Sequence, residues 1–140
     1  MAAINPYLMF NGNAEEALNF YKSVFGGEFP MLMRFKEAPP EHRGAESESD
    51  KIMHIALPIG EGNVLMASDA PEAQKVTIGN NFNISISASS KEEADRLFNR
   101  LSEGGQAYMP MANTFWGSYF GMLKDKFDVQ WMVSYDNQHQ

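Results

Sequence analysis

A repeated pattern is the feature of this sequence that most constrains its fold. The stretch NAEEALNFYKSVFGG begins at Asn13, and SKEEADRLFNRLSEGG begins at Ser90. Each copy opens with a residue that can cap a helix and has a glutamate, Glu16 or Glu93, three positions later, which is the spacing of a capping box. Each copy ends at a pair of glycines, which favour the backbone conformation found at a helix C-terminus. The copies lie 77 residues apart at their starts and 78 apart at the glycines, so we interpret them as an internal duplication with one inserted residue.

Apolar residues mark one buried helical face in each copy. They recur at positions i, i+3, i+4 and i+7, which fall on one side of an α-helix. The pattern therefore predicts one amphipathic helix in each half of the chain. The expected buried residues are Ala17, Phe20, Tyr21 and Val24 in the first helix and Ala94, Leu97, Phe98 and Leu101 in the second.

Strand-like segments surround each predicted helix, one before it and three after it. Residues 82–87 alternate apolar and polar side chains, as a half-buried strand does. The turn at residues 60–63, Gly-Glu-Gly-Asn, predicts a hairpin between the two strands that flank it. Each half therefore has the order β-α-β-β-β, and we expect one α+β domain of two modules, 1–69 and 82–136, joined by a linker at 70–81. The expected strands cover residues 7–10, 29–35, 52–59, 64–68, 82–87, 107–111, 119–124 and 129–135.

One stretch falls outside this regular pattern. Residues 37–51, EAPPEHRGAESESDK, are rich in proline, glutamate and serine and predict a mobile loop. A loop of this length is unusual in a compact domain. It is either a flexible insertion or a lid over a binding site.

Composition excludes several classes of protein. A net charge of −7 and a pI near 4.9 argue against non-specific nucleic-acid binding, which needs lysine and arginine to replace counterions. No apolar run approaches the roughly 18 residues of a membrane span, so we expect no membrane association. The N-terminus has neither a basic start nor an apolar signal region, so we expect a cytoplasmic protein. The chain has no cysteine, which excludes disulfides, thiol nucleophiles and thiolate metal sites.

Specific motifs connect this pattern to a known family. They are PYLMFNGNAEEALNFYKSVFGG, HIAL and LMASDA in the first half, and TFWGSYFGMLKDKFDVQWMV in the second. With the tandem β-α-β-β-β order, the chain resembles the PhnB-like (3-demethylubiquinone 3-methyltransferase-like) branch of the glyoxalase/bleomycin resistance/dioxygenase (vicinal oxygen chelate) superfamily. The resemblance implies two curled sheets that face a ligand groove, outer helices and a homodimer. That branch usually has glycine at the position of Asp128, in the turn before the last strand, and aspartate tolerates the left-handed conformation that such a turn needs.

The metal ligands of that superfamily are missing at the corresponding positions. Its metal-dependent members carry His, Gln or Glu on the first strand of each unit and Glu on a late strand. This chain offers Pro6 or Tyr7 on the first strand, and Phe82 or Asn83 on the fifth. Met132 stands where a glutamate would align on the last strand, so we expect no metal and no other cofactor.

His54 and Asp69 are the candidate catalytic residues. His54 is the only histidine in a predicted strand, and imidazole suits proton transfer near neutral pH. Alternatively, His54 is a partly buried strand residue that is hydrogen-bonded to its neighbours. Asp69 follows the strand LMAS and is either the acid–base partner of His54 or the cap of the turn into Ala70 and Pro71.

The candidate ligand-binding residues are one arginine, an aromatic cluster and a methionine. Arg34 could bind an anionic ligand through its forked guanidinium, or be an exposed strand residue. The aromatic side chains could form a pocket wall, the core or a dimer interface. The ten methionines suit an adaptable binding surface, although ordinary use in the core is the default explanation. The ligand-binding set is Arg34, Phe115, Trp116, Tyr119, Phe120 and Met132.

Three functions are compatible with these observations. The first is a metal-independent protein that binds a small organic molecule in an apolar cleft. The second is a lyase-, isomerase- or glyoxalase-type enzyme that uses His54 and Asp69, or a metal held in an unconventional way. The third is a scaffold with a vestigial pocket. A Rossmann-type methyltransferase site is not indicated, because the chain lacks a Gly-x-Gly-x-x-Gly loop between a strand and a helix.

Overall fold

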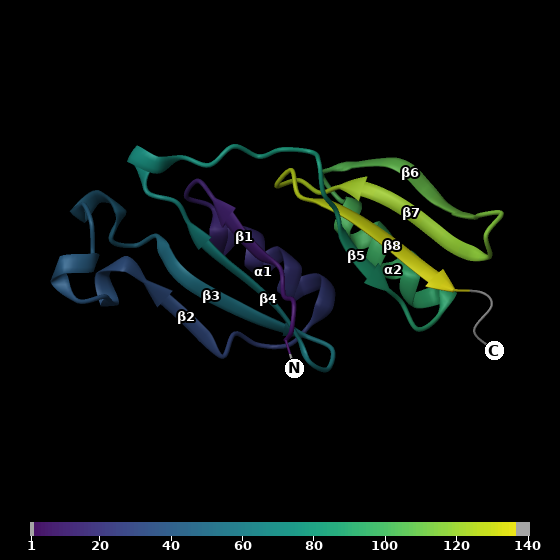
Figure 1. Cartoon of the computed structure of the whole chain (residues 1–140), viewed down its shortest axis with the longest axis horizontal. Helices are drawn as coiled ribbons and strands as arrows, with labels where there is room; N and C mark the ends of the chain where they lie inside the picture. Colours follow the sequence, from purple (N-terminus) through teal and green to yellow (C-terminus); the bar gives the residue numbers. More distant parts are fainter. Residues whose placement is uncertain (1, 137–140) are drawn as a thin grey trace. The chain divides into compact units, whose positions relative to one another are not determined.

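The computed structural model describes residues 2–136, and the chain divides into two compact units, one ending at Thr77 and the other beginning at Ile78 (Figure 1). Each unit holds one four-stranded sheet and one long helix. The first unit contains β1 (Tyr7–Phe10), α1 (Ala14–Phe25), β2 (Met31–Arg34), β3 (Ile52–Ile59) and β4 (Asn63–Asp69). The second contains β5 (Ile84–Ser87), α2 (Lys91–Ser102), β6 (Gln106–Asn113), β7 (Ser118–Lys124) and β8 (Gln130–Asp136).

The two sheets have the same topology. Their strand orders are β1-β4-β3-β2 and β5-β8-β7-β6, and only the first pair in each is parallel. The register repeats as well, since Met66 pairs with Tyr7 and Ala56 as Met132 pairs with Ser85 and Met122. This confirms the α+β fold with a tandem β-α-β-β-β repeat.

Each helix packs on one face of its own sheet (Figure 1). The expected face of α2 is confirmed, because Ala94, Leu97, Phe98 and Leu101 are all buried. In α1, Leu18 is fully buried whereas Phe20 is only half-buried, so the predicted face is rotated slightly. The sheets contribute Leu8, Phe10, Ile55, Leu57, Leu65 and Ala67 to the core of the first unit and Leu123, Trp131 and Val133 to that of the second.

The two helices begin differently, despite the similar sequences. The Ser90 hydroxyl accepts the backbone N–H of Glu93 at 3.0 Å, as the capping-box spacing predicts. The prediction for Asn13 is wrong, because its side chain makes no capping hydrogen bond. The carboxylate of Asp69, at the end of β4, accepts the N–H groups at the start of α1 instead. The first helix is therefore capped from a distant strand, which no local sequence pattern reveals.

The turn before β8 has the conformation that its sequence predicts. Asp128 has a φ of 68°, and it is the only residue other than glycine with positive φ among those that the structure describes. Its N–H donates to the carbonyl of Asp125 at 3.0 Å. The aspartate thus keeps the left-handed turn where the resembling family has glycine.

The segment at residues 37–51 contains short 3₁₀ helices. They are η2 (Pro40–His42) and η3 (Glu46–Glu48), and η1 (Phe35–Glu37) precedes them. The Arg34 guanidinium of β2 donates to the Asp50 carbonyl near the end of the segment, and the Lys51 amine pairs with Glu72 beyond it. A further one-turn helix, η4 (Glu72–Gln74), lies in the expected linker, and the Glu72 N–H donates to Glu48. The end of the segment is therefore joined to β2 and to the linker.

We predict that acid weakens the ion pair of Arg34 with Glu15. Its guanidinium donates to both carboxylate oxygens of Glu15, at 2.9 and 2.8 Å, and this lowers the pKa of Glu15 from its ordinary value of 4.5. A carboxyl with a lowered folded pKa contributes stability that is present above its unfolded pKa and is lost as the pH falls through the folded pKa. The melting temperature should therefore fall as the pH drops below about 4.5, and Glu15→Gln should reduce that fall.

Circular dichroism melts between pH 7 and pH 3 test this expectation. Glu61→Gln is the control, since Glu61 lies in the exposed β3–β4 turn and forms no ion pair among the described residues. The prediction fails if Glu15→Gln and Glu61→Gln lose stability equally over this range.

Candidate functional site: two methionine-lined sheet faces

The face of the first sheet that points away from α1 is lined by methionine. Side chains of paired residues share a face, and alternate residues point to opposite faces. Across the four strands, one row reads Tyr7, Met66, Ala56 and Met31. The next row holds Met9, Ser68, His54 and Met33. We call these eight residues the first methionine face.

The second sheet has a corresponding face. Gly121 points toward α2, because a Cβ atom there would lie 2.8 Å from Phe98, so its neighbours Phe120 and Met122 point away from the helix. Met132, Met122 and Met109 then lie side by side on three adjacent strands. The second methionine face consists of Ser85, Met132, Met122, Met109, Ser87, Ser134, Phe120 and Ala112.

These two faces hold seven of the ten methionines, and several of them are open to solvent. Met9, Met31 and Met109 expose 42%, 45% and 46% of their surface. Thioether side chains are flexible and polarizable and adapt to ligands of different shape. The faces therefore have the character of an apolar binding surface, and Met132, a predicted ligand-binding residue, lies on one of them.

His54 lies on the first methionine face, where its ring contacts Tyr7. The Tyr7 hydroxyl and His54 Nδ1 are 3.2 Å apart, and the two rings are tilted with centroids 5.7 Å apart. The register of β3 shifts between its pairings with Met33 and Arg34, which leaves Met53 outside the ladder. The resemblance places the missing first-strand metal ligand at Pro6 or Tyr7, and here the Tyr7 hydroxyl contacts the imidazole.

Asp69 is not on the same face as His54. Its side chain is buried on the α1 side of β4 and accepts three backbone N–H groups. Oδ1 accepts from Gly12 at 3.0 Å and Ala14 at 2.9 Å, and Oδ2 accepts from Ile52 at 2.8 Å. These contacts place Asp69 in the framework of the first unit, at the entry of α1 and the start of β3. The structure therefore does not bring the two candidate catalytic residues together.

The Arg34 guanidinium is already hydrogen-bonded to other groups of the protein. Besides its two hydrogen bonds to Glu15, Nη1 donates to the carbonyl of Asp50 at 3.0 Å. An anionic ligand would have to compete with this bidentate pair. Arg34 thus joins α1, β2 and the end of the 37–51 segment.

The aromatic cluster predicted from the sequence divides between two faces of the second sheet. Adjacent strand residues alternate, so Phe120 lies on the second methionine face and Tyr119 on the side of α2. The Tyr119 hydroxyl donates to Asp95 of α2 at 2.6 Å, and this hydrogen bond raises the pKa of Tyr119. Phe115 and Trp116 lie in the β6–β7 turn with 98% and 56% exposure, and Trp116 also contacts Phe120 edge-on. Only Phe120 of the four is placed among the methionines.

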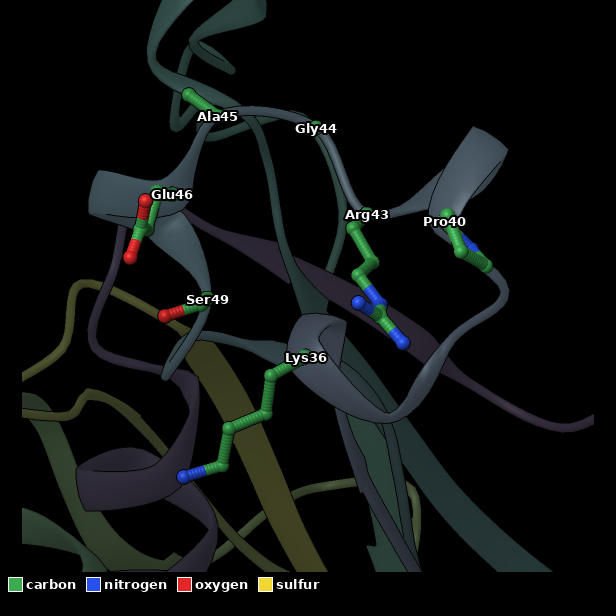
Figure 2. Close-up of a pocket in the computed structure, with 7 residues that line it drawn as sticks. All are labelled: Lys36, Pro40, Arg43, Gly44, Ala45, Glu46 and Ser49. Carbon is green, nitrogen blue, oxygen red and sulfur yellow. The ribbon is translucent and has the colours of Figure 1, made fainter.

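A separate pocket of about 490 Å³ lies within the segment after β2, and its lining residues are labelled in Figure 2. None of the methionines contributes to it. The Arg43 guanidinium donates through Nε to the Ala38 carbonyl at 2.7 Å, and the Lys36 amine pairs with Asp50 at 2.9 Å. Its lining differs from the apolar cleft expected from the sequence; it consists of Lys36, Pro40, Arg43, Gly44, Ala45, Glu46 and Ser49.

Over residues 2–136, no group of three or more His, Cys, Asp or Glu side chains is arranged to hold a metal ion. In the same range, no helix is long and apolar enough to cross a membrane.

The sequence predicts one methionine, Met132, as a ligand-binding residue but does not predict the arrangement of the others. Met66 and Met132 occupy matching positions in the repeated register. The available signal was the alternation of methionine within strands, as in Met31 and Met33. Tyr7 was considered only as a position where a metal ligand was missing.

Comparisons with known proteins agree with this fold. A crystal structure of a glyoxalase/bleomycin resistance protein from Albidiferax ferrireducens T118 has a TM-score of 0.60 at 16% identity, and it covers 95% of this chain and 98% of that one. The class is therefore that of the glyoxalase/bleomycin resistance fold.

Closer similarities define the family within that class. The family model described as 3-demethylubiquinone-9 3-methyltransferase matches residues 2–134. Protein YjdN from Escherichia coli (strain K12) is 30% identical over 139 aligned positions, and the match covers 94% of this chain and 93% of that protein. Protein PA1353 from Pseudomonas aeruginosa is 42% identical with a TM-score of 0.87, over 97% of this chain and 98% of that one. A PhnB protein from Bacillus cereus, titled a putative 3-demethylubiquinone-9 3-methyltransferase, is 28% identical with a TM-score of 0.73, over 96% and 99%.

The chain belongs to this family, the PhnB-like branch of the glyoxalase/bleomycin resistance superfamily.

Proposed function

We propose that this protein binds a small apolar organic molecule on its methionine faces without a metal ion. The observation that carries the proposal is the placement of seven methionines on the sheet faces opposite the two helices. Thioethers pack well against aromatic rings, each contact contributing about 0.3–1.5 kcal/mol. A flat, apolar ring is therefore the ligand chemistry that these faces fit best. We further propose that the protein is cytoplasmic and that it forms a homodimer, which the resemblance to the superfamily implies.

Methionine-methyl NMR of the full-length protein tests the proposal. The family description names a demethylubiquinone, so a short-chain benzoquinone is the first probe and naphthalene, which lacks the quinone oxygens, is the second. We expect saturable shifts of the methyl signals of Met31, Met66, Met122 and Met132. Met111 is the internal control, because its sulfur lies on the α2 side of the second sheet, 2.7 Å from where a Cβ atom of Gly121 would be.

Two outcomes would contradict this function. One is the absence of saturable shifts with both probes. The other is an equal shift of Met111, which would indicate non-specific partitioning of the probe into the protein.

An acid–base enzyme is the second candidate, and the contact of Tyr7 with His54 favours it. In that case His54 would exchange a proton with the ligand and Tyr7 would orient the ring. His54→Gln should then abolish turnover while the methyl shifts on ligand binding persist. Unchanged turnover in that variant would exclude His54 as the acid–base group, and binding without turnover in the wild-type protein would favour the binding function.

A further inference from the structure

The first methionine face differs from the second in carrying an imidazole. Met33 pairs directly with His54 across β2 and β3. The register of β3 and β4 pairs Ile55 with Ala67, so the next position places Ser68 on the other side of His54. The corresponding row of the second sheet contains Ser134 and Phe120 and has no imidazole.

Further thioethers surround this histidine. Met66 and Met31 lie on the same face, on the two strands that pair with β3. Both pair with Ala56, two residues from His54, so each is a diagonal neighbour of His54. Diagonal neighbours on a sheet face are separated by about 7–8 Å between Cα atoms, within reach of long side chains. Met9 approaches from β1, where its sulfur lies 3.5 Å from the Ser68 hydroxyl. Flexible methionine side chains can therefore converge on the ring from both sides.

The contact with Tyr7 prepares the imidazole to act as a ligand. Tyr7 Oη lies 3.2 Å from Nδ1, so this hydroxyl can engage one ring nitrogen and leave Nε2 for an external group. Histidines that bind metals usually have a partner at the other nitrogen, which fixes the tautomer and the ring orientation. The half-buried ring remains reachable from solvent.

We propose that the first methionine face binds a soft monovalent metal ion, Cu(I), through His54 Nε2 and the thioethers of Met33, Met66 and Met31. Thioether and imidazole ligands select Cu(I), whereas carboxylates and carbonyl oxygens suit hard divalent ions. No carboxylate or thiolate belongs to the eight described residues of this face. The site shares Met31 and Met66 with the surface proposed above for an organic ligand, and neither proposal requires the other.

Anaerobic competition with the Cu(I) chelator bathocuproine disulfonate tests the site in the full-length protein. We expect one tight Cu(I) ion per chain. His54→Ala and the shape-conserving Met33→Leu should each weaken the affinity at least tenfold, and Tyr7→Phe by about tenfold, as loss of a supporting partner does. Met132→Leu and Met111→Leu are matched controls that remove a thioether from the second face and from the helix side, and they should leave the affinity unchanged.

Nitrogen-15 NMR of the imidazole gives an independent readout with Ag(I), which has similar ligand preferences and no redox chemistry here. Binding should shift the Nε2 signal of His54 much more than the Nδ1 signal. The proposal is overturned if the wild type does not compete with the chelator, or if Met132→Leu weakens binding as much as Met33→Leu. It is also overturned if the Nε2 signal does not move at saturating Ag(I).

Discussion

Replacing Asp69 with alanine is expected to destabilise the first unit by about 4 kcal/mol, since each buried N–H group left without an acceptor costs about 1–3 kcal/mol and two of the three donors, Ala14 and Ile52, are buried. The carboxylate is 3% exposed and accepts hydrogen bonds from Gly12, Ala14 and Ile52. It joins the end of β4 to the start of α1 and the start of β3. Loss of the carboxylate should therefore open both connections together.

Urea unfolding followed by far-ultraviolet circular dichroism measures this effect, and amide hydrogen exchange locates it. Asp69→Asn should reduce the free energy of unfolding less than Asp69→Ala, because its side-chain oxygen can still accept from the N–H groups at the start of α1. Its NH2 group would face the N–H of Ile52 and could not accept from it. Glu61→Ala, at an exposed turn, is the control and should change stability by less than about 0.5 kcal/mol. A loss below about 1 kcal/mol in Asp69→Ala, with unchanged exchange in α1, would show that the carboxylate does not hold this unit together.

Replacing Asp125 with alanine should destabilise the second unit by a similar amount, about 3–4 kcal/mol. Asp125 is 1% exposed in the β7–β8 turn, where Oδ1 accepts from the N–H groups of Phe127 and Val129. Oδ2 accepts from the indole N–H of Trp131 at 2.8 Å. The substitution leaves this buried indole without its acceptor and removes two bonds that shape the turn.

Tryptophan fluorescence during urea unfolding reports this change directly, because both tryptophans, Trp116 and Trp131, belong to the second unit. A double-mutant cycle with Trp131→Phe isolates the indole bond, and the effect of Asp125→Ala should be smaller in that background. Glu103→Ala, on an exposed residue after α2, is the control. Equal effects of Asp125→Ala with and without the indole would contradict a contribution from the Trp131 bond.

The position of Asp69 explains why the two candidate catalytic residues, His54 and Asp69, do not meet in the structure. A carboxylate next to a predicted strand is compatible with catalysis and with capping, and the sequence alone leaves both open. The structure places Asp69 on the α1 side of β4 and His54 on the opposite face of the sheet. An acid–base mechanism in this protein would therefore depend on His54 and Tyr7.

Local patterns in the sequence determined most of the fold. The helix of the second half, with its Ser90 cap and its buried face, follows from side-chain periodicity and one short-range hydrogen bond. The repeat predicted two equal modules because the same spacing of apolar residues requires the same packing twice. The β3–β4 hairpin and the left-handed turn at Asp128 follow equally from local turn chemistry.

Only the tertiary structure decided which side chains meet. The cap of α1 comes from Asp69, 55 residues after Ala14, and Arg34 bridges to Glu15 on the helix and to Asp50. The methionine faces likewise depend on the strand order and register of each sheet, which place Met66 beside Ala56 and Met132 beside Met122. Periodicity assigns a side chain to one face of its own strand, but its neighbours on that face are set by pairings between distant segments, whose energies no local window of sequence contains.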